Sequence, residues 1–103
     1  MANVFKNELA SCTDDSATIA YTAGASTTAI LIGCNLSNTG AADIAVDVAM
    51  GNKYIIKGVT IPVGSALSVL EGKIVVETGQ ALVVVSDSAT GDCDVIVSML
   101  EQS

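Results

Sequence analysis

The amino-acid sequence predicts an all-β domain, a single antiparallel β-sandwich of the jelly-roll or immunoglobulin-like kind with about eight strands. Three observations lead to this prediction. Short runs of Val, Ile, Leu and Ala recur along the chain and in places alternate with small or polar residues. Glycine, proline and asparagine stand between those runs, where tight turns need a preset or a positive φ. No window combines the spacing of an amphipathic helix with a cap and a stop.

The first half of the chain contains three predicted strands. Ile19 to Thr22 is a short one, and Thr28 to Asn38 is a longer one that ends in an Asn-Thr-Gly turn signal. Ile44 to Met50 has the most regular alternation, because every second residue is Ile, Val or Met and the others are Asp or Ala. The dipeptide Gly51-Asn52 then predicts a two-residue hairpin with a type II′ turn, which requires glycine at its first central position.

The second half of the chain repeats this pattern of strand and tight turn. Its breaks are Ile61-Pro62-Val63-Gly64 and two glycine turns in the segments EGK and ETGQ. The strands predicted between and beyond these breaks are Tyr54 to Val59, Ala66 to Leu70, Lys73 to Glu77, Ala81 to Ser86 and Asp92 to Leu100.

Period-two alternation also predicts which side chains form the core, since alternate residues of a strand share a face. Only three residues of the chain are aromatic, so the core has to be aliphatic. The residues predicted to be buried are Ile30, Ile32, Cys34, Ile44, Val46, Val48, Val95 and Val97.

The first 17 residues differ from the rest because they are polar with scattered hydrophobic side chains. We therefore divide the chain into residues 1–17, an N-terminal arm or edge strand, and residues 18–103, the β-sandwich domain. A loose strand of this kind can pair with a neighbouring protein by strand addition. Its hydrophobic side chains Val4, Phe5 and Leu9 are the predicted partner-binding residues.

Charge and composition argue against several classes of function. Eleven acidic residues against four lysines, with no arginine, give a net charge of −7, which disfavours binding to nucleic acid. The sequence has no apolar run of the length that a membrane helix needs, and its start does not follow the pattern of a signal peptide. Three cysteines without CxxC spacing are expected to be free thiols. We expect no membrane association.

Reaction chemistry is hard to find in this sequence. It contains no histidine, which removes the usual general base near neutral pH and the commonest metal ligand. No glycine-rich phosphate-binding motif occurs. Cys12, Cys34 and Cys93 would each need a neighbouring base to act as a nucleophile. We therefore expect a protein that is not an enzyme, with no catalytic residues, no cofactor and no bound metal.

Two binding sites remain open as alternatives. Asp87, Asp92 and Asp94 surround the turn at 88–91 and could converge on calcium, although their spacing matches no EF-hand loop. Tyr21 and Tyr54 could stack against a sugar ring, as in a carbohydrate-binding adhesin module, although two separated tyrosines make a poor platform. A solvated hairpin and ordinary packing explain the same residues.

The segments NLSNTGAADIAVDVAM, YIIKGVTIPVGSALSVLEGKIVVETGQALVVVS and DVIVSMLE together resemble small bacteriophage virion proteins of marine and cyanobacterial tailed phages. The shared pattern is an Asn-Thr turn, a Pro-x-Gly turn, a GK-I-V-V-E-x-G strand and a closing strand that starts acidic and ends in S-x-L-E. It covers roughly residues 18 to 102. Such families usually have Gly-Asp where this chain has Gly79-Gln80, a change that leaves the turn intact.

The resemblance implies a non-enzymatic virion structural protein. The favoured role is a capsid decoration, or cement, subunit that stabilises the head; the alternative is a tail, baseplate or fibre component. The implied partners are the major capsid protein or other virion proteins. A symmetric homo-oligomer is expected, with a trimer favoured because trimers suit three-fold positions of a capsid. The protein would be made in the cytoplasm of a bacterial host and reside in the virion.

Overall fold

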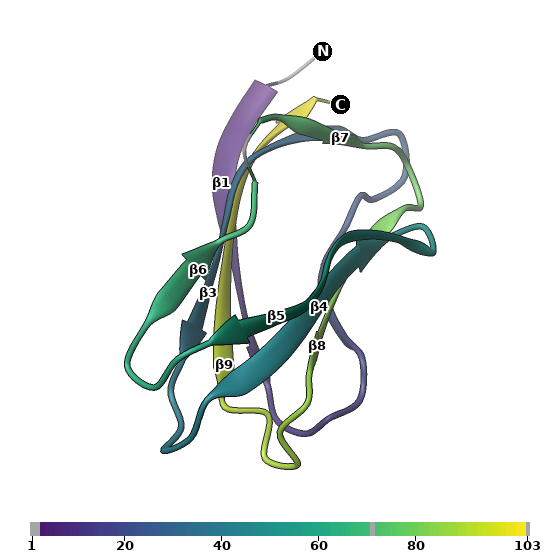
Figure 1. Cartoon of the computed structure of the whole chain (residues 1–103). Coiled ribbons are helices and arrows are strands. Elements are labelled where there is room, and N and C mark those ends of the chain that lie inside the picture. The colour runs from purple at the N-terminus through teal and green to yellow at the C-terminus, as the bar shows by residue number, and fades with distance from the viewer. Residues whose placement is uncertain (1–2, 71, 103) are drawn as a thin grey trace.

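The computed structural model describes residues 3–70 and 72–102, and within them the chain forms nine strands and no helix (Figure 1). The domain is elongated, with extents of 45 × 21 × 20 Å. The strands are β1 (Asn3–Cys12), β2 (Thr18–Thr22), β3 (Thr28–Asn38), β4 (Ile44–Met50), β5 (Lys53–Ile61), β6 (Ala66–Ser68), β7 (Ile74–Val76), β8 (Ala81–Ser86) and β9 (Cys93–Gln102).

The strands form two antiparallel sheets. In sheet A the order is β1-β9-β3-β6, with β7 also paired to β3, and in sheet B the order is β2-β8-β4-β5. Every early strand pairs with its counterpart from the other end of the chain: β1 with β9, β2 with β8, β3 with β6 and β7, and β4 with β5. This is a long hairpin folded over on itself, which is the arrangement of a jelly roll rather than of an immunoglobulin domain.

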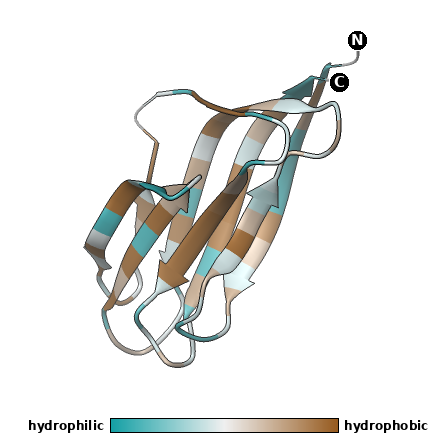
Figure 2. Ribbon diagram, turned by 90° about the vertical axis from the view of Figure 1, so that its right-hand side faces the viewer, coloured by the Kyte–Doolittle hydropathy of each residue, from teal (hydrophilic) through white to brown (hydrophobic). Residues whose placement is uncertain are grey.

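The core lies between the two sheets and is aliphatic, as the sequence predicts. Hydrophobic and hydrophilic residues alternate along the strands (Figure 2), and the hydrophobic ones with inward-facing side chains are buried. Six of the residues predicted to be buried are indeed in the core. They are Cys34, Ile44, Val46, Val48, Val95 and Val97, none of which is more than 3% exposed.

The prediction that Ile30 and Ile32 are buried is wrong, and both residues lie on strand β3. Ile32 is 47% exposed and Ile30 is only half-buried, whereas Ala29 and Leu31 are fully buried. The pairing of β3 with β9 shifts register between Leu31 and Gly33, so one extra residue is inserted at that point. An inserted residue reverses the alternation, and the phase seen at Cys34 therefore does not extend to the start of the strand.

The hairpin between β4 and β5 also differs from its prediction in one respect. Met50 pairs with Lys53, so the loop has the expected two residues. Both central residues have positive φ, 57° at Gly51 and 68° at Asn52. That combination defines a type I′ turn rather than the predicted type II′ turn, and asparagine is one of the few side chains that tolerates it.

The first seventeen residues begin with a regular strand. β1 pairs with β9 over all ten of its residues, from Asn3 opposite Gln102 to Cys12 opposite Cys93, without a register shift. It lies at the end of sheet A, so it is an edge strand (Figure 1). The described part of the chain contains no helix that is long and apolar enough to cross a membrane.

Candidate functional site

The outer face of sheet A, which points away from sheet B, carries a row of apolar side chains. Phe5 on β1 lies opposite Leu100 on β9. Leu100 in turn lies opposite Ile30 on β3, and Ile30 lies opposite Val75 on β7. Residues directly opposite one another in a sheet project to the same side. The four side chains therefore form one apolar row across four strands.

The bulge in β3 adds a further apolar residue to this face. It turns Ile32 outward on β3, two residues along the strand from Ile30. Phe5 is 74% exposed, the same value as Leu9 further along β1. A shallow hollow of about 240 Å³ opens here, and its walls come from Phe5, Lys6, Asn7, Ile32, Ser98 and Met99.

A second apolar pair lies next to the row. Leu9 on β1 is directly opposite Ile96 on β9, which is 44% exposed. A polar contact separates this pair from the row, because the Ser98 hydroxyl donates a hydrogen bond of 2.6 Å to the Asn7 side chain. We call the whole surface the outer patch. It consists of Phe5, Leu9, Ile30, Ile32, Val75, Ile96 and Leu100.

The outer patch carries little charge, although the protein is strongly acidic. Among the outward-facing residues of β1, β9 and β3, Asp94 is the one ionisable side chain, and it accepts a hydrogen bond of 2.8 Å from Ser11. Exposed apolar surface with few charges is typical of the centre of a protein–protein interface. The patch extends about 14 Å along β1, from Phe5 to Leu9, and about 14 Å across the four strands.

The three predicted partner-binding residues do not share one face. Phe5 and Leu9 lie in the outer patch, but Val4 has the opposite orientation on β1 and lies across from Glu101. Alternation along a strand makes this unavoidable for neighbouring residues. The sequence prediction did not include the other five residues of the outer patch, which are Ile30, Ile32, Val75, Ile96 and Leu100. The available signal was Ile96, an isoleucine between two core valines at a position that must face outward.

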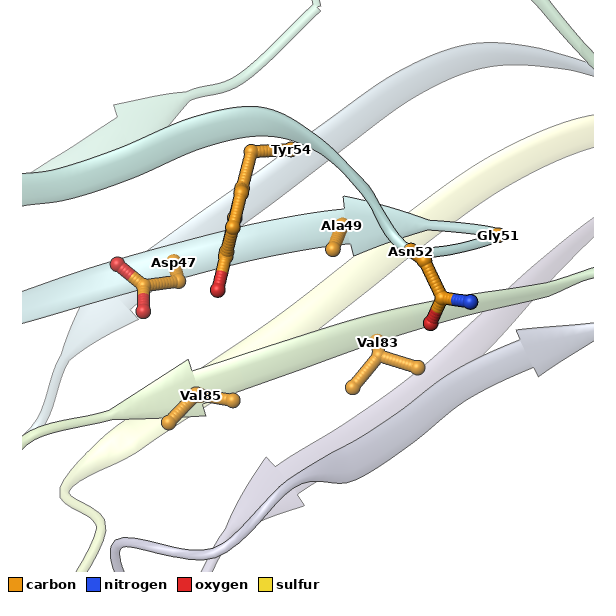
Figure 3. Close-up of a pocket in the computed structure, with 7 residues that line it drawn as sticks. All are labelled: Asp47, Ala49, Gly51, Asn52, Tyr54, Val83 and Val85. Atoms are coloured by element: carbon orange, nitrogen blue, oxygen red, sulfur yellow. The ribbon is translucent and has the colours of Figure 1, made fainter.

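The outer face of sheet B contains a different kind of hollow (Figure 3). It has a volume of about 290 Å³ and is lined by Asp47, Ala49, Gly51, Asn52, Tyr54, Val83 and Val85. The Tyr54 side chain reaches from β5 across β4 towards these residues. Lys57 lies 4.4 Å from the centre of the Tyr54 ring and 3.7 Å from the Asp47 carboxylate.

The second tyrosine is not available to a sugar. Tyr21 is buried between the sheets, and its hydroxyl donates a hydrogen bond to Glu101. Burial, together with this hydrogen bond, raises the pKa of Tyr21. Lys6 lies 3.7 Å from the same Glu101 carboxylate and 3.1 Å from Glu8. Tyr21 and Tyr54 therefore do not form a joint platform.

The three carboxylates around the β8–β9 turn bind different donors. Asp87 accepts a hydrogen bond from the backbone of Ala45, and Asp92 accepts from the hydroxyls of Thr90 and Ser88, each at 2.8 Å. Both hydrogen bonds lower the pKa of Asp92, and the one from Thr90 has the larger effect. In the described ranges no cluster of three or more acidic, cysteine or histidine side chains has the geometry of a metal site.

All three cysteines are buried as free thiols, and two of them are neighbours. Cys12 and Cys93 lie directly opposite each other on β1 and β9. The neighbouring Cys93 thiol lowers the pKa of Cys12 to about 7. Burial raises the pKa of Cys34 to about 11.

Comparison with known proteins adds no family to this description. No protein-family model, no curated protein and no solved structure matches the chain.

Proposed function

We propose that the protein is a non-enzymatic virion structural subunit of a bacteriophage, a capsid decoration protein that binds the head through its outer patch. The observation that carries the proposal is the exposed, nearly uncharged apolar surface on an otherwise acidic jelly roll. Exposed apolar side chains that lie together with few charges among them mark a place where another protein can bind. The resemblance of residues 18 to 102 to phage virion proteins supplies the kind of partner, a major capsid protein.

The outer patch suits a rigid docking role. It lies on paired strands rather than on loops, so its side chains need little ordering when a partner binds. Burial of one large apolar side chain of this kind contributes about 1.5–3 kcal/mol. A few such contacts repeated over a capsid lattice would hold the subunit in place and stabilise the head against heat or internal pressure.

The experiment is a binding assay with heads of the phage that carries this gene, stripped of the protein. Purified wild-type protein should cosediment with the heads, saturate at a fixed number of copies per capsomer and raise the temperature at which the heads lose DNA. Ile32→Asp should weaken binding about tenfold or more, because it places a charge in the docking surface. Ile19→Asp is the matched control, since Ile19 is a 64% exposed isoleucine on the outer face of sheet B.

One outcome would contradict the decoration role, and another would contradict the outer patch as the docking surface. Cosedimentation with tails but not with heads would assign the protein to a tail, baseplate or fibre. Equal binding by Ile32→Asp and wild type would show that the outer patch is not the docking surface.

A second candidate function is carbohydrate binding, and one observation favours it. The hollow on sheet B places the exposed ring of Tyr54 beside polar groups of Asp47 and Asn52, which is the minimum that a sugar site needs. A glycan array probed with wild type and with Tyr54→Ala tests it. Binding that disappears in Tyr54→Ala would support an adhesin module, and a blank array would remove this candidate.

A further inference from the structure

The strand β1 is the longest and most regular edge of the sandwich. It has ten residues, contains neither proline nor glycine, and pairs with β9 without a bulge. Its other side has no paired strand in the described part of the molecule. Long regular edges of this kind invite pairing with another chain, so proteins usually shorten, bulge or cover them.

The other edges of the two sheets show the usual protection. The far edge of sheet A is divided between β6 and β7, which have three residues each. β2 has a register shift between Ile19 and Tyr21, and the pairing of β5 with β4 shifts twice. β1 differs from these edges in its length and regularity, and its inward-facing charges, Lys6 and Glu8, disfavour pairing with any strand that does not offer the opposite charges.

The sequence of β1 is complementary to an antiparallel copy of itself about Asn7. With Asn7 opposite Asn7 of the second copy, Lys6 lies opposite Glu8, and Glu8 lies opposite Lys6. Phe5 lies opposite Leu9 on the outer face. The remaining pairs are Val4 with Ala10 and Asn3 with Ser11. Each apolar residue meets an apolar one, each polar residue a polar one, and each charge its opposite, which are the pairs that stabilise adjacent strands.

Other registers are disfavoured by the same residues. Directly opposite side chains must project to the same side, so the register can change only in steps of two. A shift in one direction places Lys6 against Lys6 of the second copy. A shift in the other direction places Glu8 against Glu8. Like charges directly opposite are destabilising, so the alignment about Asn7 is the favoured one.

From this complementarity we propose that the protein forms a two-fold symmetric dimer in which β1 pairs antiparallel with β1 of a second copy, centred on Asn7. Sheet A then continues from one subunit into the next. The two-fold axis is perpendicular to the sheet, so the outer faces of both copies lie on the same side. Phe5 of each subunit meets Leu9 of the other, and the two outer patches join into one surface. The dimer does not depend on the capsid proposal.

The test is the mass of the full-length protein in solution, measured by sedimentation equilibrium. Wild type should have twice the chain mass of 10.3 kDa. Lys6→Glu places four carboxylates at the centre of the interface, and Glu8→Lys places four ammonium groups there. Each variant alone should have a dimer dissociation constant raised about tenfold or more. Lys53→Glu, the same charge change on the exposed β4–β5 hairpin, should remain dimeric.

An equimolar mixture of the two variants makes the test specific. In a heterodimer of Lys6→Glu with Glu8→Lys, every charge again meets its opposite, so the mixture should recover the dimer. Loss of the ion pair within one chain, in which Lys6 lies 3.1 Å from Glu8, would not be repaired by mixing. Monomeric or trimeric wild type, single variants that stay dimeric, or a mixture that stays monomeric would each overturn the proposal.

A cross-link provides a second measurement that does not depend on the charges. Asn7→Cys places two thiols directly opposite each other on the two-fold axis, and oxidised glutathione should convert them into an intermolecular disulfide with release of two glutathione thiols. Ser11→Cys is the control, because Ser11 lies opposite Asn3 of the second copy and not opposite itself. A covalent dimer from Asn7→Cys but not from Ser11→Cys supports the register, and equal yields overturn it.

Discussion

Replacement of Gly91 by alanine should strongly destabilise the protein. Gly91 lies in the turn between β8 and β9 with a φ of +77°. A Cβ atom at this position would lie 2.0 Å from the carbonyl oxygen of Cys12 and 2.6 Å from the backbone nitrogen of Thr13. Both neighbours are main-chain atoms at the end of β1, so the clash can be relieved only if the turn or the strand moves.

The expected loss of unfolding free energy combines two contributions. A left-handed backbone costs about 1–2 kcal/mol for a residue with a Cβ, and forcing an atom into a closely packed site costs about 1–3 kcal/mol. The sum is about 2–5 kcal/mol, a large part of the roughly 5–15 kcal/mol that stabilises a typical domain. At about 4 °C per kcal/mol for a chain of this size, the melting temperature should fall by about 8–20 °C.

Substitutions at two further glycines distinguish the backbone contribution from the steric one. Gly58 has a φ of +65° but nothing within 4 Å of a Cβ, so Gly58→Ala should show the backbone cost alone, about 1–2 kcal/mol. Gly24 has an ordinary φ and open space, so Gly24→Ala should be neutral or slightly stabilising. The chain has no tryptophan, and urea unfolding followed by far-ultraviolet circular dichroism is therefore the suitable assay. If Gly91→Ala loses no more stability than Gly58→Ala, the contact with Cys12 carries no cost and the reasoning is wrong.

Three other predictions test the core, the thiol pair and the acidic turn. Leu31→Ala should cost about 2–5 kcal/mol of unfolding free energy and Ile32→Ala less than about 1 kcal/mol; equal losses would refute the bulge. Oxidised glutathione should join Cys12 to Cys93 with release of two glutathione thiols, and mass spectrometry should show a protein lighter by two hydrogen atoms; an unchanged mass would contradict their pairing. The lowered pKa of Asp92 stabilises the fold above the unfolded-state pKa of about 4, and this contribution is lost as the pH falls through the folded-state value. Asp92→Asn should therefore be less stable than wild type at pH 7, a difference that should shrink in acid unfolding curves; a constant difference would contradict it.

The strand boundaries were predictable because their causes are local. The limits of β3, β4 and β8 match the prediction residue for residue, because the turn that begins at Asn38 and the hairpin at Gly51 end strands there; the other predicted strands differ from the structure by one or two residues at an end. It is harder to predict which residues of a strand point into the core. Alternation with a period of two predicts that Ile30 and Ile32 share the core-facing side of β3 with Cys34, and the single residue inserted between Leu31 and Gly33 reverses that alternation. Gly33 beside the bulge was the one local hint, because a glycine inside a strand often marks such an insertion.

The outer patch could not have been predicted from the sequence. Its row joins Phe5, Ile30, Val75 and Leu100, which come together only because the folded-over hairpin places β1, β9, β3 and β7 side by side. The order of strands in a sheet follows from how the whole chain packs, and no local pattern encodes it. On β1 the prediction names Phe5 and Leu9, which share the outer face, together with Val4, which alternation places on the other face; that these residues bind a partner stays a prediction.

The resemblance to phage proteins favours a trimer, whereas pairing through the edge strand β1 gives a dimer. The assembly state in solution can therefore distinguish between the two. A trimer at a three-fold capsid position needs a head-to-tail interface, in which two different surfaces meet, whereas β1 paired with β1 is a two-fold interface in which one surface meets itself. Each subunit has one β1 strand, and its free edge is occupied once two copies pair. A third copy therefore has no equivalent edge to pair with. A dimeric protein that binds heads would therefore occupy two-fold or pseudo-two-fold positions, with the joined outer patches facing the lattice. A trimer would instead leave the regular edge of β1 to pair with a strand of the capsid protein itself.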